Sequence, residues 1–178
     1  MEDTVNVVIA MDGSEHAKFA FKYYMDEIHN PKFNIVMVHV VGPPESLHKT
    51  EWYKAHDSQT IHKILEEEKA KLKETLEGYG QLLKDAEVQG TVQSIHASQP
   101  GRGIIQAAED CNAQMIVTGC RGIGKVRRTL MGSVSDYVVH HATVPTLVCR
   151  HPRDHHDHGT PQIRHVVYRT GAIRKRHE

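Results

Sequence analysis

Short apolar runs alternate with longer amphipathic stretches along the first 150 residues of the chain. The runs TVNVVIAM (4–11) and NIVMVHVV (34–41) are rich in β-branched residues, which is typical of strands buried on both faces. Between them, apolar residues from 17 to 28 recur at a helical spacing behind Ser14, a good N-cap, and Asn30-Pro31 ends the stretch. The chain therefore opens with a strand, a helix and a second strand.

The same alternation continues to residue 150 and predicts an α/β fold. The remaining predicted elements are a long charged helix at 61–86 that Gly78 and Gly80 weaken, a strand at 91–97, a turn at Pro100-Gly101, a helix at 104–111, a strand at 114–118, a helix capped by Ser133, and a strand at 144–150 whose start is limited by Pro145. Strands that alternate with helices predict a single doubly wound domain, with a five-stranded parallel sheet and helices on both faces.

Length and charge bound the class of protein. The 178 residues suit one domain at 1–150 followed by a His-rich basic tail at 151–178. Net charge is zero overall, with 15 Lys/Arg against 19 Asp/Glu in residues 1–149 and 7 against 3 in residues 150–178. This balance gives no reason to expect nucleic acid or a membrane surface as a partner. The chain also has no apolar run near the ~18 residues of a membrane span and no secretory signal, so we expect a soluble cytoplasmic protein.

The tail and the cysteines carry weaker signals. His and Asp residues of HPRDHHDH (151–158) have spacings compatible with a metal, but a metal site needs a folded frame, and a flexible basic tail is the favoured interpretation. No metal site is therefore predicted. Cys111, Cys120 and Cys149 form no C-x-x-C pair and are expected to be reduced thiols, with Cys120 an ordinary exposed one.

The stretch GCRGIGKVRRTLMGS (119–133) carries the main candidate chemistry. Its glycines allow a close approach of the backbone to a ligand, and its four basic residues attract an anion. The stretch fits the first seven positions of the Walker A pattern, but Val126 lacks the hydroxyl that holds Mg²⁺. The dinucleotide pattern G-x-G-x-x-G fails because Arg127 stands where the third glycine belongs.

The position of this loop predicts a crevice at the end of the sheet. Ligands of doubly wound sheets bind at the carboxyl ends of the strands. Asp12 closes the first predicted strand, and the glycine loop follows the fourth. If these two strands are neighbours, both segments face one crevice.

The spacing G-x2-G-x9-G-S, formed by Gly119, Gly122, Gly132 and Ser133, resembles the nucleotide-binding signature of the universal stress protein family. The resemblance covers about residues 4–150 and includes Asp12, the VHV end of the second strand and the VPTLVCR strand. It implies membership of the ATP-binding branch and a homodimer formed by pairing of Val144–Arg150 with its two-fold mate.

The resemblance also implies the residues of the site. The main chain at Val40 would face the adenine, Asp12 would hold the ribose or the base side, and the glycine signature would hold ribose and phosphates. The residues expected to bind the nucleotide are Ala10, Met11, Asp12, Val40, Thr118, Gly119, Arg121, Gly122, Gly132, Ser133 and Val134. The expected ligand is ATP, or ADP or AMP, together with Mg²⁺.

Three functions stay open at this point. The first is a nucleotide-dependent regulatory module in a stress response, and the second is a slow enzyme that hydrolyses ATP or transfers its phosphate. Catalysis needs a placed base and a metal ligand near the γ-phosphate, and only Asp12 and Ser133 are plausible participants. The third is an interaction module that binds no nucleotide. His39, inside an apolar strand, is interpreted as a hydrogen-bonded core histidine.

Overall fold

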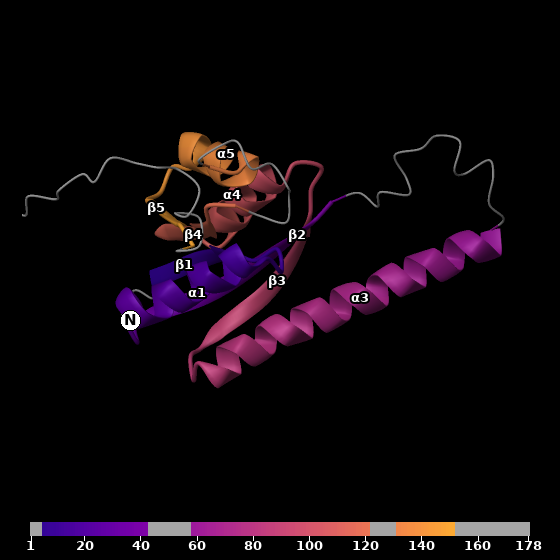
Figure 1. Ribbon diagram of the computed structural model, residues 1–178, viewed down its shortest axis with the longest axis horizontal. Coiled ribbons are helices and arrows are strands. Elements are labelled where there is room, and N and C mark those ends of the chain that lie inside the picture. The colour runs from indigo at the N-terminus through magenta and orange to yellow at the C-terminus, as the bar shows by residue number, and fades with distance from the viewer. Residues whose placement is uncertain (1–4, 43–57, 122–130, 152–178) are drawn as a thin grey trace, which may run out of the picture.

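The computed structural model of the 178-residue chain describes residues 5–42, 58–121 and 131–151. Strands and helices alternate through these ranges (Figure 1). Their bounds are β1 Val5–Ala10, α1 Glu15–Glu27, β2 Phe33–Val41, α3 Ser58–Asp85, β3 Gly90–His96, α4 Pro100–Asp110, β4 Met115–Gly119, α5 Ser133–His141 and β5 Thr146–Cys149. Apart from His151, the predicted His-rich tail lies outside the described residues.

The five strands form one parallel sheet in the order β3-β2-β1-β4-β5. The α/β class and the doubly wound parallel sheet are therefore confirmed. β1 lies at the centre, paired with β2 on one side and with β4 on the other, where Ile9 is in register with Val117. The carboxyl ends of β1 and β4 consequently lie side by side, as the predicted crevice requires.

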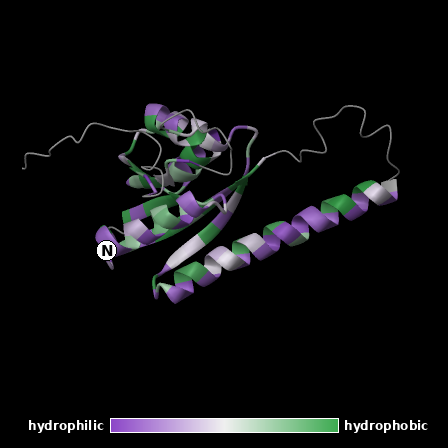
Figure 2. Cartoon of the chain, viewed as in Figure 1, coloured by the Kyte–Doolittle hydropathy of each residue, from purple (hydrophilic) through white to green (hydrophobic). Residues whose placement is uncertain are grey.

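Helices cover both faces of the sheet, and each face has its own core. Val7 and Ile9 of β1 pack in one cluster with residues of α1 and α3, while Val8 and Ala10 pack in the other with residues of α4 and α5. Successive residues of a strand point to opposite faces, so a strand covered on both faces has to be apolar throughout. In Figure 2 the helices carry hydrophobic and polar residues in alternation along their length, as helices with one buried side do.

The helix predicted at 61–86 forms as α3 and continues through Gly78 and Gly80, with Tyr79 and Leu83 on the same turns buried in the core, each with only 5% exposure. The turn predicted at Pro100-Gly101 is wrong. Pro100 and Gly101 form the first turn of α4 instead of a turn before it. Proline suits this position, since the first N–H of a helix has no partner within the helix.

The last strand is shorter than predicted. β5 spans Thr146–Cys149, whereas the apolar run predicts 144–150. Pro145 has no N–H to donate, but its carbonyl oxygen accepts a bond of 3.0 Å from Ile116 N, so it joins the ladder as an acceptor only. Within the described ranges, no helix combines the length and apolar character that a bilayer span requires.

We predict that Val8→Ala lowers the free energy of unfolding by about 1–3 kcal/mol, because it removes two carbons from a fully buried site and leaves a cavity. The matched control is Val139→Ala on α5, where the side chain is 43% exposed and a change of about 0.5 kcal/mol or less is expected. Urea denaturation of both variants measures the difference. Equal losses would contradict the two-sided burial of β1.

Candidate functional site

A cleft of about 1000 Å³ opens at the carboxyl ends of β1, β2 and β4, with the starts of α4 and α5 on its other side. The strands and the residues directly after them supply Ala10, Met11, Asp12, Val38, His39, Val40, Val41, Gly42, Thr118, Gly119 and Arg121. The helices and the residues before α5 supply Ala17, Pro100, Ile104, Met131, Gly132, Ser133, Val134, Ser135 and Asp136. Segments that are far apart in the sequence therefore share one cavity.

The predicted nucleotide-binding residues gather in this cleft. All of them except Gly122 line it. Gly122 lies outside the described residues, as do the loop's basic residues Lys125, Arg127 and Arg128. The structure brings the predicted residues together, and their roles toward a ligand stay predictions.

Asp12 is held at the edge of the cleft by its own turn. Its Oδ1 atom accepts a hydrogen bond of 2.9 Å from the backbone N–H of Ser14, and Gly13 between them has a φ of 82°. Ser14 in turn caps α1, because its Oγ accepts from Ala17 N at 3.2 Å. Burial raises the pKa of the nearby Tyr79 to about 12, and the negative charge of Asp12 contributes to this shift. The turn thus fixes one carboxylate beside the ends of the strands.

His39 connects β2 to the end of β1. Its Nδ1 lies 2.8 Å from the carbonyl oxygen of Met11, and because a carbonyl only accepts, Nδ1 carries the hydrogen. Its ring also lies 5.8 Å from the ring of Tyr79, centroid to centroid. The predicted hydrogen bond is present, but the prediction of a core residue is wrong, because His39 is half-buried and lines the cleft.

The backbone of Val40 points toward the cleft. Val38 O accepts from Met11 N on the β1 side, whereas Val41 O accepts from Ala97 N on the β3 side. Hydrogen-bonding groups alternate sides along a strand, so those of Val40 point to the β1 side. The register between β1 and β2 ends at the pair Ala10 and Val38, two residues before Val40. The N–H and C=O of Val40 therefore face the space beyond the end of β1.

The start of α5 forms the opposite wall of the cleft. Gly132 is the N-cap, with φ −73° and ψ 153° and no side-chain capping bond, so the prediction that Ser133 caps this helix is wrong. The capping region is held by Ser135 instead, whose Oγ lies 3.0 Å from both Cys120 O and Gly132 O. The N–H groups of the first turn have no partners within the helix, and the helix dipole makes this end attractive to an anion.

The glycines make room for neighbouring chain segments. A Cβ at Gly119 would lie 2.7 Å from the backbone carbon and oxygen of His16 in α1, and a Cβ at Gly132 would lie 3.2 Å from Cys120 O. Gly119 and Gly132 therefore have a packing role in addition to the ligand contact predicted for them, because they let α1 and α5 approach the end of β4 closely.

Cys120 is fully buried, so the prediction of an exposed thiol is wrong. Its N–H donates to Cys149 O at 2.8 Å, which extends the ladder with β5 one residue past β4. Its Sγ lies 3.8 Å from His16 Nδ1. The residue therefore belongs to the sheet, and the loop begins after it.

The universal stress protein family model matches residues 5–150, the part of the chain that builds the sheet and the cleft. The chain belongs to this family. Among curated relatives, a universal stress protein of Staphylococcus epidermidis is 30% identical over 165 residues, covering 89% of this chain and 94% of the relative. A second relative, from Staphylococcus aureus strain USA300, is 29% identical over 147 residues, covering 82% of this chain and 83% of the relative.

Solved structures of family members share the fold. The universal stress protein UspA from Lactobacillus plantarum is 21% identical with a TM-score of 0.64, covering 83% of this chain and 98% of that one. A family protein from Arabidopsis thaliana, solved with AMP bound, is 20% identical with a TM-score of 0.60. The match covers 84% of this chain and 94% of that one. A universal stress protein solved in complex with cAMP is 15% identical with a TM-score of 0.56. The match covers 83% of this chain and 97% of that one.

We predict that Gly119→Ala destabilises the protein by about 1–3 kcal/mol, because its Cβ collides with the backbone of α1 and overpacks a rigid contact. The matched control is Gly80→Ala in α3, where a Cβ meets nothing within 4 Å and alanine favours the helix by about 0.5–1 kcal/mol. Thermal unfolding of the two variants should shift in opposite directions. A neutral Gly119→Ala would show that α1 does not approach β4 this closely.

Proposed function

We propose that the chain binds ATP, or ADP or AMP, in the cleft and works as a nucleotide-dependent regulatory module in a stress response. The observation that carries the proposal is the meeting of three different groups in one cavity. These are a carboxylate at Asp12, backbone groups at Val40 and the start of a helix at Ser133. A nucleotide needs these three kinds of contact for its ribose, base and phosphates.

Each contact has its own physical basis. The N–H and C=O of Val40 form a donor and acceptor pair that suits the edge of adenine, and Asp12 accepts hydrogen bonds from ribose hydroxyls. The first turn of α5 attracts phosphate through its N–H groups and dipole, with Arg121 in the same lining. Mg²⁺ would be held mainly by the phosphates and water, as is usual for this ion.

Two solved family members support an adenine nucleotide as the ligand. One was solved with AMP bound and another in complex with cAMP. Their likeness to this chain is a likeness of fold, so the transfer rests on the cleft residues. Ala10, Thr118 and Val134 add further walls at the positions where the family signature expects ligand contacts.

A slow ATPase or phosphotransferase is the alternative function, and the geometry gives it little support. The carboxylates that line the described cleft are Asp12 and Asp136. Asp12 already accepts a backbone hydrogen bond, and Asp136 is in the first turn of α5. Each carboxylate therefore already has a structural role, at a turn or at a helix start. We therefore expect regulation by occupancy.

We predict that ATP, ADP and AMP compete for the cleft and that GTP binds at least about 10-fold more weakly, because a fixed donor and acceptor pair rejects a base with the reversed pattern. Calorimetry with each nucleotide and Mg²⁺ measures this.

Val40→Pro should abolish ATP binding while the sheet persists, because the lost N–H points beyond β1. The control is Val41→Pro, which removes an N–H group that faces β3 and should destabilise the sheet. Equal affinity for GTP would remove the adenine assignment, and turnover at ~1–100 s⁻¹ would favour the enzyme.

We also propose that β5 pairs with its two-fold mate to form a homodimer. β5 is an edge strand, and the carbonyls of Pro145 and Cys149 bond to β4. By alternation, the backbone groups of Thr146 and Val148 point to the open edge. A two-fold axis there pairs the open groups of both copies at once.

We predict that Val148→Pro disrupts this dimer without unfolding the chain, because it removes an outward N–H and leaves the ladder with β4 in place. Leu147→Pro is the matched control, since it removes a donor that faces β4 and should destabilise the fold. Light scattering at tens of micromolar gives the mass, and circular dichroism reports the fold. A wild-type chain that is already monomeric, or a dimer that survives Val148→Pro, would count against the interface.

A further inference from the structure

The start of α5 is joined to the sheet by hydrogen bonds. The carbonyl oxygen of Cys120, the residue directly after β4, accepts from Gly132 N at 2.7 Å and from Ser135 Oγ at 3.0 Å. The N–H of the same cysteine donates to Cys149 O of β5 at 2.8 Å, and its side chain is fully buried. The point at which α5 begins is therefore set by the end of the sheet.

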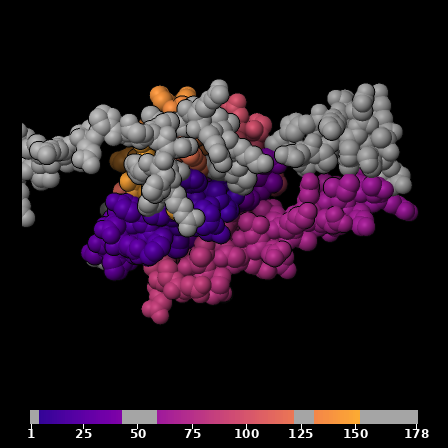
Figure 3. Space-filling view, viewed as in Figure 1, coloured from indigo at the N-terminus to yellow at the C-terminus, as the bar shows by residue number. Residues whose placement is uncertain are grey.

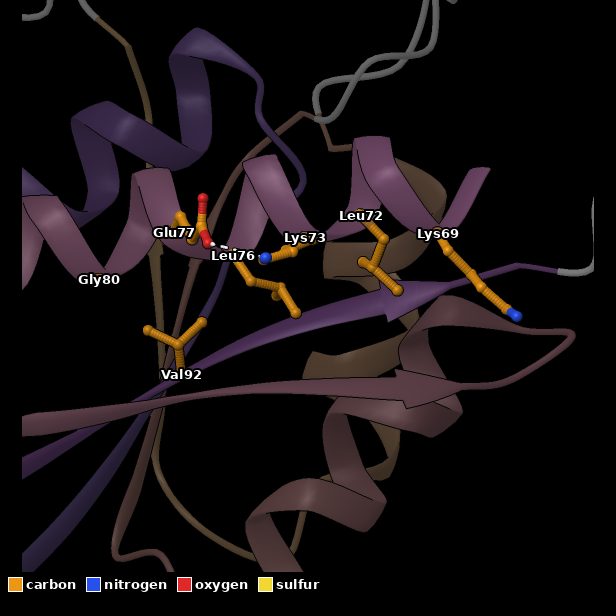
Figure 4. A pocket seen from close by; sticks show the side chains of 7 residues that line it. All are labelled: Lys69, Leu72, Lys73, Leu76, Glu77, Gly80 and Val92. Atoms are coloured by element: carbon orange, nitrogen blue, oxygen red, sulfur yellow. Dashed lines mark ion pairs between the residues drawn. The ribbon is translucent and has the colours of Figure 1, made fainter. Parts of the chain in front are cut away.

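Apolar side chains hold α3 against the other face of the sheet. Its residues in or against the two described clusters all lie at Leu76 or later. Figure 4 shows Leu72 and Leu76 pointing from the helix toward the strands, with Val92 of β3 facing them. Figures 1 and 3 show the N-terminal half of this helix extending beyond the strands. Apolar contacts are not directional, whereas the hydrogen bonds at α5 fix both distance and direction.

Ser135 supplies the second of the two bonds at the start of α5. Its side chain is only 2% exposed, and its Oγ also lies 3.0 Å from Gly132 O, so both carbonyls share the one hydroxyl hydrogen. Gly132 is the N-cap, and a bond at the N-cap alone would let the helix pivot about it. The bond from Ser135, three residues further along, fixes the direction of the first turn.

This turn carries the donors that face the cleft. Its first bond within the helix runs from Asp136 N to Gly132 O at 2.9 Å, so the N–H groups of residues 133–135 have no partner inside the helix. All three residues line the cleft. Several donors hold one anion well only when their positions are fixed before it arrives. The placement of these donors depends on the bonds at Cys120 O.

We propose that Ser135 is a positioning residue for the phosphate end of the cleft. Its hydroxyl is directed at the backbone of Cys120 and Gly132 and does not contact the ligand. By holding the first turn of α5 against the end of β4, it keeps the three N–H groups converged on one phosphate. This inference rests on the proposed function, and it names the residue that prepares the phosphate site of an adenine nucleotide.

Adenosine and AMP separate the two ends of the cleft, because they differ only in the phosphate. Calorimetry gives the affinity of each for the wild type and for Ser135→Ala. We expect the variant to bind AMP about 2- to 12-fold more weakly, which corresponds to the loss of one hydrogen bond, and to bind adenosine as the wild type does. Ser135→Thr keeps a hydroxyl at this position and should keep the wild-type ratio of the two affinities.

Val138→Ala is the matched control for a general loss of stability. Val138 lies on the same helix, is fully buried and packs in the core on this face of the sheet. Its truncation should lower the midpoint of thermal unfolding but leave the ratio of AMP to adenosine affinity unchanged. A role of Ser135 in stability alone would give the same pattern as this control.

Hydrogen exchange in the ligand-free protein tests the link without any nucleotide. The amides of Gly132 and Asp136 donate to Cys120 O and Gly132 O, so they report on the start of α5 directly. In Ser135→Ala both should exchange faster than in the wild type, relative to the amide of Met11, which donates to Val38 O at 2.8 Å. Val138→Ala should not change this relative rate.

The two measurements distinguish failure of this inference from failure of the proposed function. If the wild type prefers AMP and Ser135→Ala keeps both the preference and the exchange rates, nucleotide binding stands and the positioning role is wrong. If the wild type binds adenosine and AMP equally, the phosphate does not lie at α5 and the inference is also wrong. A wild type that binds neither removes the proposed function and the phosphate role together.

Discussion

The parallel pairing of β1 with β4 is the contact on which the rest of the molecule depends. From β1 at the centre, the chain first adds β2 and β3 on one side of the sheet. It then returns to add β4 and β5 on the other side. The helices that follow β1 and β4 consequently leave on opposite faces, α1 on one and α5 on the other. Among the described residues no helix crosses the sheet at this change of direction, and the cleft opens there.

This contact also explains why small residues surround the cleft. β4 ends between α1 and α5, and both helices have to come close to its last residues. Gly119 admits the backbone of His16 from one side, and Gly132 admits Cys120 O from the other. The glycine spacing that resembles a ligand signature is therefore also a packing requirement of the chain. The two explanations are compatible, because the packing sets the width of the cavity that a ligand would enter.

Much of the fold could be predicted from the sequence because burial on both faces leaves a plain signal. β1 and β2 are central strands, so they are nearly continuous apolar runs, and the helices between strands carry a single apolar stripe. The errors occur where a local signal competes with packing. Pro100 and Gly101 are typical turn residues, yet they form the first turn of α4. Ser133 is a favourable cap by type, yet Ser135 makes the bonds that hold this end.

The candidate site was predictable to the extent that it consists of strand ends. Asp12, Val40 and Thr118 lie at or next to the carboxyl ends of three predicted strands, so their convergence could be expected on the condition that the first and fourth strands are neighbours, which the strand order meets. Pro100, Ile104 and Asp136 were missed because they come from α4 and α5, whose distance from the sheet depends on side-chain packing. Cys120 was misplaced for a related reason, since only the register with Cys149 shows that the ladder continues past Gly119.

The two edges of the sheet differ in a way that bears on how copies of the chain associate. β3 carries exposed polar residues at Thr91, Gln93, Ser94 and His96, and its apolar Val92 is turned toward α3. Polar side chains along an edge do not bury well against another strand, so strand pairing is disfavoured there. β5 is short and mostly apolar, with the sequence TLVC and Thr146 as its one polar residue. Backbone pairing therefore suits the β5 edge, whereas at the β3 edge the apolar surface available for contact belongs to the helix beside the strand.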